Sequence, residues 1–109
     1  MVSYKEYEIA KILDKINIEY EREYSFLDLK DTNMLRFDFA IFQNQKLLGL
    51  IEYQGRQHFS SPEKFNHYGL LQEHDAMKMK YCQDNNIPLL LLDKSHNLEA
   101  EIVQWLNNL

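Results

Sequence analysis

The stretch that decides the fold is residues 35–58, LRFDFAIFQNQKLLGLIEYQGRQH. Apolar residues alternate with other residues over positions 35–42, and a second apolar segment follows at 48–53. Because successive side chains of a strand point to opposite faces, this pattern predicts a β-hairpin. We expect residues 44–46 to form a three-residue loop and Asp38 to point away from the phenylalanine face.

Two carboxylates fall opposite each other in this predicted hairpin. With a loop at 44–46, Asp38 faces Glu52, and their Cβ atoms lie about 5 Å apart. Two unpaired carboxylates at that distance repel each other, whereas a divalent cation between them makes the arrangement favourable. The pair therefore predicts a cation site. The structural alternative is that Asp38 pairs with Arg36 on its own strand face.

Length and composition indicate one small domain. The chain has 109 residues, of which 45% are hydrophobic, enough for a single core. No apolar run is long enough to span a membrane, and there is no secretory signal, so we expect no membrane partner. The single cysteine, Cys82, excludes an internal disulfide and a cysteine zinc site. A reducing cytoplasm is therefore the expected location, the host cytoplasm if the chain is encoded by a phage.

The charge balance is acidic. Twelve basic and seventeen acidic residues give a formal charge of −5, which counts against a simple nucleic-acid binder. Residues 56–80 differ, because they contain most of the histidines together with several basic residues. We expect any contact with a polyanion to involve this segment and the hairpin, through Arg36, Arg56, Lys64, His67 and Lys78.

Helical and strand patterns flank the hairpin. Apolar residues at helical spacing predict a helix over 3–16, and clean alternation predicts a strand over 18–24 whose glutamates face solvent. Residues 25–34 and 55–69 read as polar connections. A helix over 70–85 should stop at Asn85-Asn86, where a left-handed residue is tolerated. Residues 87–92, IPLLLL, predict a strand buried on both faces. A last amphipathic helix, capped by Ser95 or Asn97, completes the order α-β-β-β-α-β-α.

This order, with Asp38 on the second strand and Glu52-x-Gln54 on the third, resembles the PD-(D/E)XK nuclease superfamily. The segments LRFDFAI, LIEYQGRQHF and DAMKMKYCQDNNIPLL are similar to small phage and bacterial endonucleases related to very-short-patch-repair endonucleases. The resemblance implies an α/β, restriction-endonuclease-like core in which helices flank a mixed central sheet. It also implies a magnesium-dependent endonuclease that hydrolyses DNA phosphodiester bonds.

The resemblance further implies a set of site residues. Asp38, Glu52 and Glu8 would hold Mg²⁺ or Mn²⁺, which hard oxygen ligands favour over zinc. Gln54 stands where the superfamily carries Lys, so an amide replaces a positive charge beside the attacking water and the phosphate. His58 or His74 would act as general base or as a donor to the phosphate, and Asp75 would orient one of them.

Several of these residues also have structural interpretations. Glu8 could be a first-turn acid favoured by the helix dipole, and Asp75 could pair with Lys78 one turn later. Three other functions compete with the DNA endonuclease: a catalytically weak nucleic-acid-binding module of the same fold, a module docked on a larger nuclease or DNA-binding partner, and a nuclease directed at RNA or at a particular structure. Because one active site cuts one strand, double-strand cleavage would require a homodimer or two binding events.

Overall fold

The computed structural model describes residues 4–54 and 62–109, with side chains from residue 73 onward in the second range. The elements are α1 (Tyr4–Lys15), β1 (Glu19–Lys30), β2 (Met34–Gln43), β3 (Lys46–Tyr53), α2 (Pro62–Asp84), β4 (Leu89–Leu92) and α3 (Leu98–Asn107). Their order is the one predicted from the sequence. Among the described residues, no helix is both long and apolar enough to cross a membrane.

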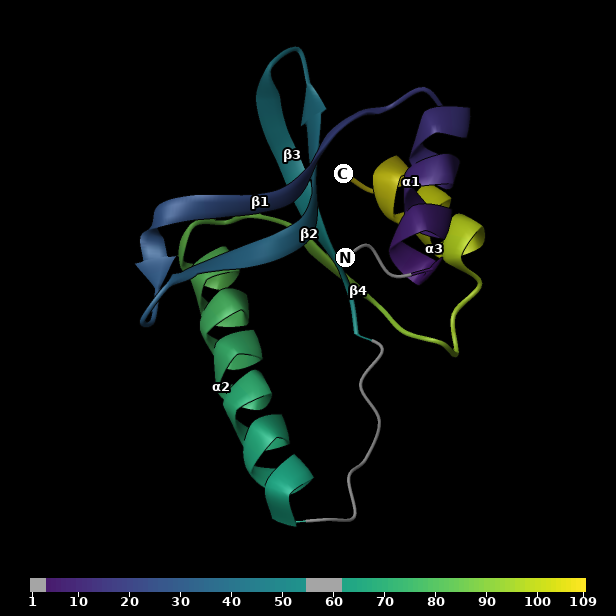
Figure 1. Ribbon diagram of the computed structural model, residues 1–109. Coiled ribbons are helices and arrows are strands. Elements are labelled where there is room, and N and C mark those ends of the chain that lie inside the picture. Colours follow the sequence, from purple (N-terminus) through teal and green to yellow (C-terminus); the bar gives the residue numbers. More distant parts are fainter. Residues whose placement is uncertain (1–3, 55–61) are drawn as a thin grey trace.

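The strands form one mixed sheet in the order β1-β2-β3-β4. The first three strands are antiparallel, and β4 runs parallel to β3. Helices α1 and α3 pack on one face of the sheet, and α2 packs on the other (Figure 1). The chain is therefore an α/β protein in which helices cover both faces of a mixed sheet.

Two separate apolar clusters hold these layers together. The first joins α1 and α3 to the sheet through fully buried residues that include Ile9, Leu13 and Ile102. The second joins α2 to the opposite face and includes Phe37, Leu50 and Cys82. Burial of apolar surface on both faces is the main favourable term that fixes the three layers.

The first two helices end in the same way. Asn17 after α1 and Asn86 after α2 adopt left-handed backbone conformations, with φ of 60° and 56°. The N–H of the next residue then bonds back into the helix, from Ile18 to the Leu13 carbonyl and from Ile87 to that of Cys82. This is the Schellman arrangement, in which asparagine tolerates the left-handed position. The predicted stop at Asn85-Asn86 is confirmed.

The central hairpin has the predicted register near Asp38 but a different loop. Its loop has two residues, Asn44 and Gln45, which both have positive φ, as a type I′ turn requires. The prediction of a three-residue loop is therefore wrong. Leu48 is an extra residue on β3, between the pairs Phe42–Leu47 and Ile41–Gly49. From Ile41–Gly49 to Phe39–Ile51 the pairs are the predicted ones.

The apolar residues of β2 do not share one face, contrary to expectation. Phe37 packs in the cluster under α2, whereas Phe39, only two residues later, packs in the cluster under α1 and α3. The change occurs where Glu23 of the neighbouring strand has a φ of 50°, between the pairs Arg22–Phe39 and Tyr24–Phe37. A left-handed residue increases the local twist of β1 and of β2, which is paired with it. Phe37 and Phe39, two residues apart in β2, therefore face different helices.

Three further predictions of secondary structure are wrong. Helix α2 begins at Pro62, so residues 62–69 belong to the helix and not to a polar connection; proline suits the first position of a helix, where no N–H is needed. Residues 25–30 continue β1 instead of forming a loop, because Phe26 and Leu29 pack in the cluster beneath α2. Strand β4 is not buried on both faces: it lies at the edge of the sheet beside β3, and only Leu92 is fully buried there. The expected exposure of Glu19, Glu21 and Glu23 is confirmed.

Candidate functional site

Asp38 and Glu52, here called the carboxylate pair, lie side by side on β2 and β3. The pairing of Phe39 with Ile51 makes them the next residues along the two strands. The Asp38 N–H donates to Oε1 of Glu52 at 2.8 Å, and the Tyr53 N–H donates to Oδ2 of Asp38 at 2.7 Å. Each carboxylate is therefore held by the backbone of the opposite strand. The predicted juxtaposition of Asp38 and Glu52 is present.

Lys78 completes this cluster from α2. Its ammonium lies 3.1 Å from Oε2 of Glu52, and the two side chains are only 14% and 8% exposed. The same ammonium lies 5.4 Å from the centroid of the Phe37 ring. We expected Lys78 to contact nucleic acid from the surface, but it is turned inward and neutralises part of the carboxylate pair.

Burial changes the acidity of both carboxylates. Removal from water raises the pKa of Asp38 to about 6, while the Tyr53 N–H and the charge of Lys78 oppose the rise. Burial also raises the pKa of Glu52 to about 7, with a further increase from Asp38 and a decrease from Lys78. Two acids and one base share a poorly hydrated space, so the pair titrates near neutral pH.

Gln54 and Asp75 lie beside the carboxylate pair. The Gln54 side-chain N–H donates to Oδ2 of Asp75 at 3.4 Å, which joins the end of β3 to α2. Both residues line a small pocket with Glu52 and Lys78 between α2 and β4. The structure thus brings together four of the predicted site residues, Asp38, Glu52, Gln54 and Asp75, and adds Lys78 to them.

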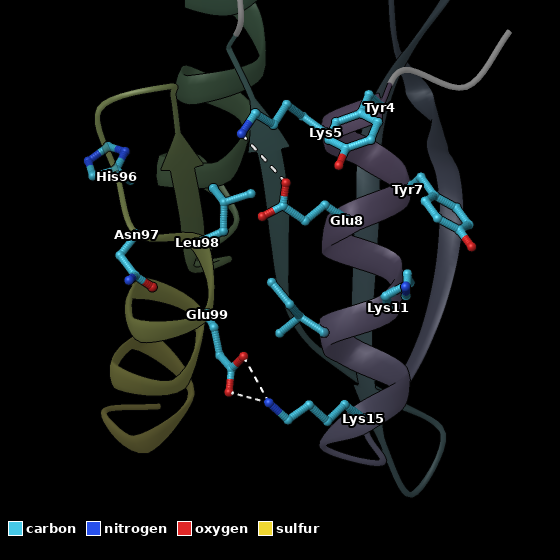
Figure 2. Close-up of a pocket in the computed structure, with 11 residues that line it drawn as sticks. Tyr4, Lys5, Tyr7, Glu8, Lys11, Lys15, His96, Asn97, Leu98 and Glu99 are labelled. Carbon is cyan, nitrogen blue, oxygen red and sulfur yellow. Dashed lines mark hydrogen bonds and ion pairs between the residues drawn. The ribbon is translucent and has the colours of Figure 1, made fainter.

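Glu8 lies elsewhere. It forms an ion pair with Lys5 at 3.5 Å and lines a cleft between α1 and α3 (Figure 2). The acid of α1 that acts on Asp38 is Glu6, whose charge raises the pKa of Asp38. Glu6 precedes Ile9 by three residues and Leu13 by seven, so the spacing of the fully buried residues could have identified it.

His74 and Arg36 also have other partners. His74 Nε2 lies 3.2 Å from Oδ2 of Asp31, at the turn between β1 and β2. Arg36 pairs with Glu23 at 3.4 Å, so the alternative in which Arg36 neutralises Asp38 is wrong. Of the remaining predicted residues, Arg56 and His58 lie outside the described residues, as do the side chains of Lys64 and His67 within α2.

The carboxylate pair suits a magnesium site with few protein ligands better than a site in which side chains supply every ligand. Among the described residues, no three histidine, cysteine or acidic side chains gather as a ligand set. Magnesium usually takes one or two carboxylates, substrate phosphate oxygens and several waters, so two carboxylates suffice. Oδ1 of Asp38 has no hydrogen-bond partner within the described parts of the chain, which leaves one oxygen available as a ligand.

Comparisons of the chain with models of protein families, with curated proteins and with solved structures found no match.

Proposed function

We propose that this chain is a magnesium- or manganese-dependent endonuclease of restriction-endonuclease-like fold that hydrolyses DNA phosphodiester bonds. The observation that carries the proposal is the carboxylate pair, half-buried Asp38 and buried Glu52, with the Lys78 ammonium 3.1 Å from Glu52. A mixed sheet with helices on both faces, and with these acids on its second and third strands, supports the same proposal.

The energetics favour a cation site over a purely structural role. Burying two adjacent carboxylates removes them from water and brings like charges together, and both effects raise the pKa of Glu52. One lysine leaves an excess negative charge when both acids are ionised. A divalent cation on the pair would remove that excess and recover the cost of burial.

The side chains divide the chemistry of phosphodiester hydrolysis among them. Bound Mg²⁺ would act as a Lewis acid and lower the pKa of a coordinated water. Asp38 and Glu52 would hold the ion. Lys78 places a positive charge next to this site, which is the electrostatic role that Gln54 cannot fill. Gln54, held against Asp75, would orient the attacking water or the phosphate through its amide.

One observation favours a second candidate function. Both oxygens of Glu52 already accept hydrogen bonds, from the Asp38 N–H and from Lys78. A carboxylate whose two oxygens already have donors within the protein is also compatible with a module that has the same fold, binds nucleic acid or docks on a partner, and does not cleave. Metal binding separates the two candidates, because the non-catalytic module has no need of it.

A plasmid cleavage assay with Mg²⁺ or Mn²⁺, and with EDTA as the negative control, tests the proposal. We expect the wild type to nick supercoiled DNA, and to produce linear DNA only as a homodimer or after a second binding event. Asp38→Asn and Glu52→Gln keep the side-chain shapes and should abolish cleavage while circular dichroism remains that of a folded protein. Asp84→Asn is the matched control, because that carboxylate is exposed and pairs only with Lys80 among the described residues. Cleavage at the wild-type rate by either site variant would exclude the carboxylate pair as the active site.

A further inference from the structure

A cleft of about 570 Å³ lies between α1 and the beginning of α3. Figure 2 shows an ion pair at each end of the cleft, Lys5 with Glu8 and Lys15 with Glu99, and Leu98 between them. The volume falls within the range of about 300–1,000 Å³ that is typical of ligand pockets. This cleft is separate from the pocket between α2 and β4 that contains Glu52.

Three lysines and two glutamates line this cleft, so lysines outnumber acids here although the whole chain carries a net charge of −5. Lys11 has no carboxylate partner among the described residues. Lys5 and Lys15 are paired, but their side chains are 43% and 66% exposed, so each ammonium can also contact a phosphate from the solvent side. His96 also lines the cleft, and its Nδ1 lies 2.9 Å from the Asp93 backbone nitrogen and 3.3 Å from Oδ1 of Asp93. The cleft therefore suits a ligand with repeated anionic groups.

Two tyrosines add aromatic surface to the same cleft. Tyr4 and Tyr7 are 79% and 56% exposed, so both rings are accessible to a ligand. Tyr4 lies at the Lys5 end, and Tyr7 projects outward from α1 with the Lys11 ammonium 5.5 Å from its ring centroid (Figure 2). Exposed rings next to lysines form the stacking platforms that bind unpaired bases. A duplex offers no such faces, because its bases already stack on one another.

Helix α1, which lines the cleft, also carries a residue whose charge acts on the carboxylate pair. Glu6 lies between Tyr4 and Tyr7 in the helix, and its charge acts on Asp38. It also pairs with Arg22 of β1 at 3.5 Å, which fixes this end of α1 against the sheet. The Tyr4–Lys5 end of the cleft is therefore the end closer to the proposed active site.

We propose that the cleft between α1 and α3 binds a single-stranded segment of nucleic acid, with bases on Tyr4 and Tyr7 and phosphates on Lys5, Lys11 and Lys15. This inference rests on the proposed function and specifies its substrate. The segment is the part of the substrate that flanks the cleaved bond, so the preferred substrate has a single-stranded region next to the cleavage point. The open rim formed by the two exposed tyrosines fits a strand that passes through better than an enclosed mononucleotide.

Fluorescence anisotropy with a labelled thymidine oligonucleotide of about 12 nucleotides tests the proposal in EDTA, where binding is measured without cleavage. We expect the wild type to bind this strand more tightly than a duplex of equal length. The double variant Tyr4→Ala/Tyr7→Ala should weaken binding by roughly tenfold or more, because base–aromatic contacts are lost. Lys11→Gln should weaken binding and reduce its salt dependence.

Matched controls use residues that are equally exposed and distant in sequence. Leu27→Ala, on β1, and Lys80→Gln, on α2, should leave binding within about twofold of the wild type if stacking and phosphate contacts are confined to the cleft. Wild-type binding by the double tyrosine variant overturns the proposal, as does equal affinity for duplex and single strand. Competition by thymidine monophosphate at the affinity of the oligonucleotide also overturns it, because the cleft would then hold a free nucleotide. A wild type that binds the strand but cuts no DNA with Mg²⁺ would instead contradict the proposed function alone.

Discussion

The ammonium of Lys78 lies 3.1 Å from Oε2 of Glu52, while Oε1 of the same carboxylate accepts the Asp38 N–H at 2.8 Å. One lysine therefore faces two adjacent acids, of which Glu52 is buried and Asp38 half-buried. When both acids are ionised, the cluster carries one uncompensated negative charge in a poorly hydrated space. The stability of the metal-free protein should for this reason depend on pH, on the charge of Asp38 and on divalent cations.

Stability should fall as the pH rises through neutrality. The folded-state pKa values of Asp38 and Glu52, about 6 and about 7, are above the ordinary values of 3.8 and 4.5. The folded protein thus binds protons more tightly, and this stabilisation is complete below about pH 4 and lost as the pH rises through 6 to 7. Each pKa unit corresponds to about 1.4 kcal/mol, but the partial exposure of Asp38 and the mutual repulsion of the two acids reduce the sum. We expect a loss of at least about 2 kcal/mol in the free energy of unfolding between about pH 4.5 and pH 8, measured by urea denaturation in EDTA.

Asp38→Asn should remove part of this pH dependence. The amide keeps an oxygen for the Tyr53 N–H and leaves the Lys78–Glu52 contact intact, so the variant loses only the repulsion. Its melting temperature in EDTA should exceed that of the wild type by roughly 5 °C near pH 8 and should equal it near pH 5. Mg²⁺ should stabilise the wild type by mass action, by about 2.7 kcal/mol at one hundred times the dissociation constant, and stabilise the variant less. A lower melting temperature for Asp38→Asn at pH 8, without any Mg²⁺ response of the wild type, would contradict the cation site.

Lys78→Met should destabilise the protein in a pH-dependent way. The methionine fills a similar volume but leaves Oε2 of Glu52 without its donor, at a cost of about 2–3 kcal/mol near pH 8. The cost should be smaller near pH 5, because Glu52 then binds a proton. Lys80→Met is the control, since that lysine is 74% exposed and pairs with Asp84, and it should change the free energy of unfolding by no more than about 0.5 kcal/mol.

The same variant tests whether Lys78 supplies the positive charge for cleavage. We expect Lys78→Met to reduce the cleavage rate by at least about 100-fold, as loss of a preorganised electrostatic group does. Adding Gln54→Lys should restore part of the rate, because position 54 lies beside Glu52 and Asp75 in the same pocket. No effect of Lys78→Met on the rate would remove Lys78 from the chemistry and leave it as a structural partner of Glu52.

Gly49→Ala should destabilise the sheet on the side of α3. A Cβ atom at this position would lie 2.6 Å from the Trp105 ring and 2.9 Å from the Pro88 carbonyl oxygen. The ring can move, but the carbonyl accepts the Leu50 N–H and joins the chain before β4 to β3. We expect a loss of about 1–3 kcal/mol in denaturant unfolding, and only partial recovery when Trp105→Leu is added. Wild-type stability of Gly49→Ala would mean that β3 and the residue before β4 are farther apart than described.

The sequence by itself determined the order of the elements and the placement of Asp38 beside Glu52 on the adjacent strand. Both follow from local rules, because apolar spacing distinguishes helices from strands and period-two alternation places facing residues of a hairpin. The asparagine after each of the first two helices and the Asn97 cap of α3 are also local, since they depend only on neighbouring backbone groups.

Only the tertiary structure decided which other residues join the carboxylate pair. Lys78 pairs with Glu52 from α2, and Glu6 rather than Glu8 acts on Asp38 from α1, because the packing of each helix sets which of its sides faces the sheet. The left-handed Glu23 and the edge position of β4 could not be predicted either. Alternation of apolar and polar residues indicates the two faces of a single strand and does not indicate which strands lie beside it. The residues that surround a site come from segments distant in sequence. The burial of apolar surface between those segments decides which residues come together.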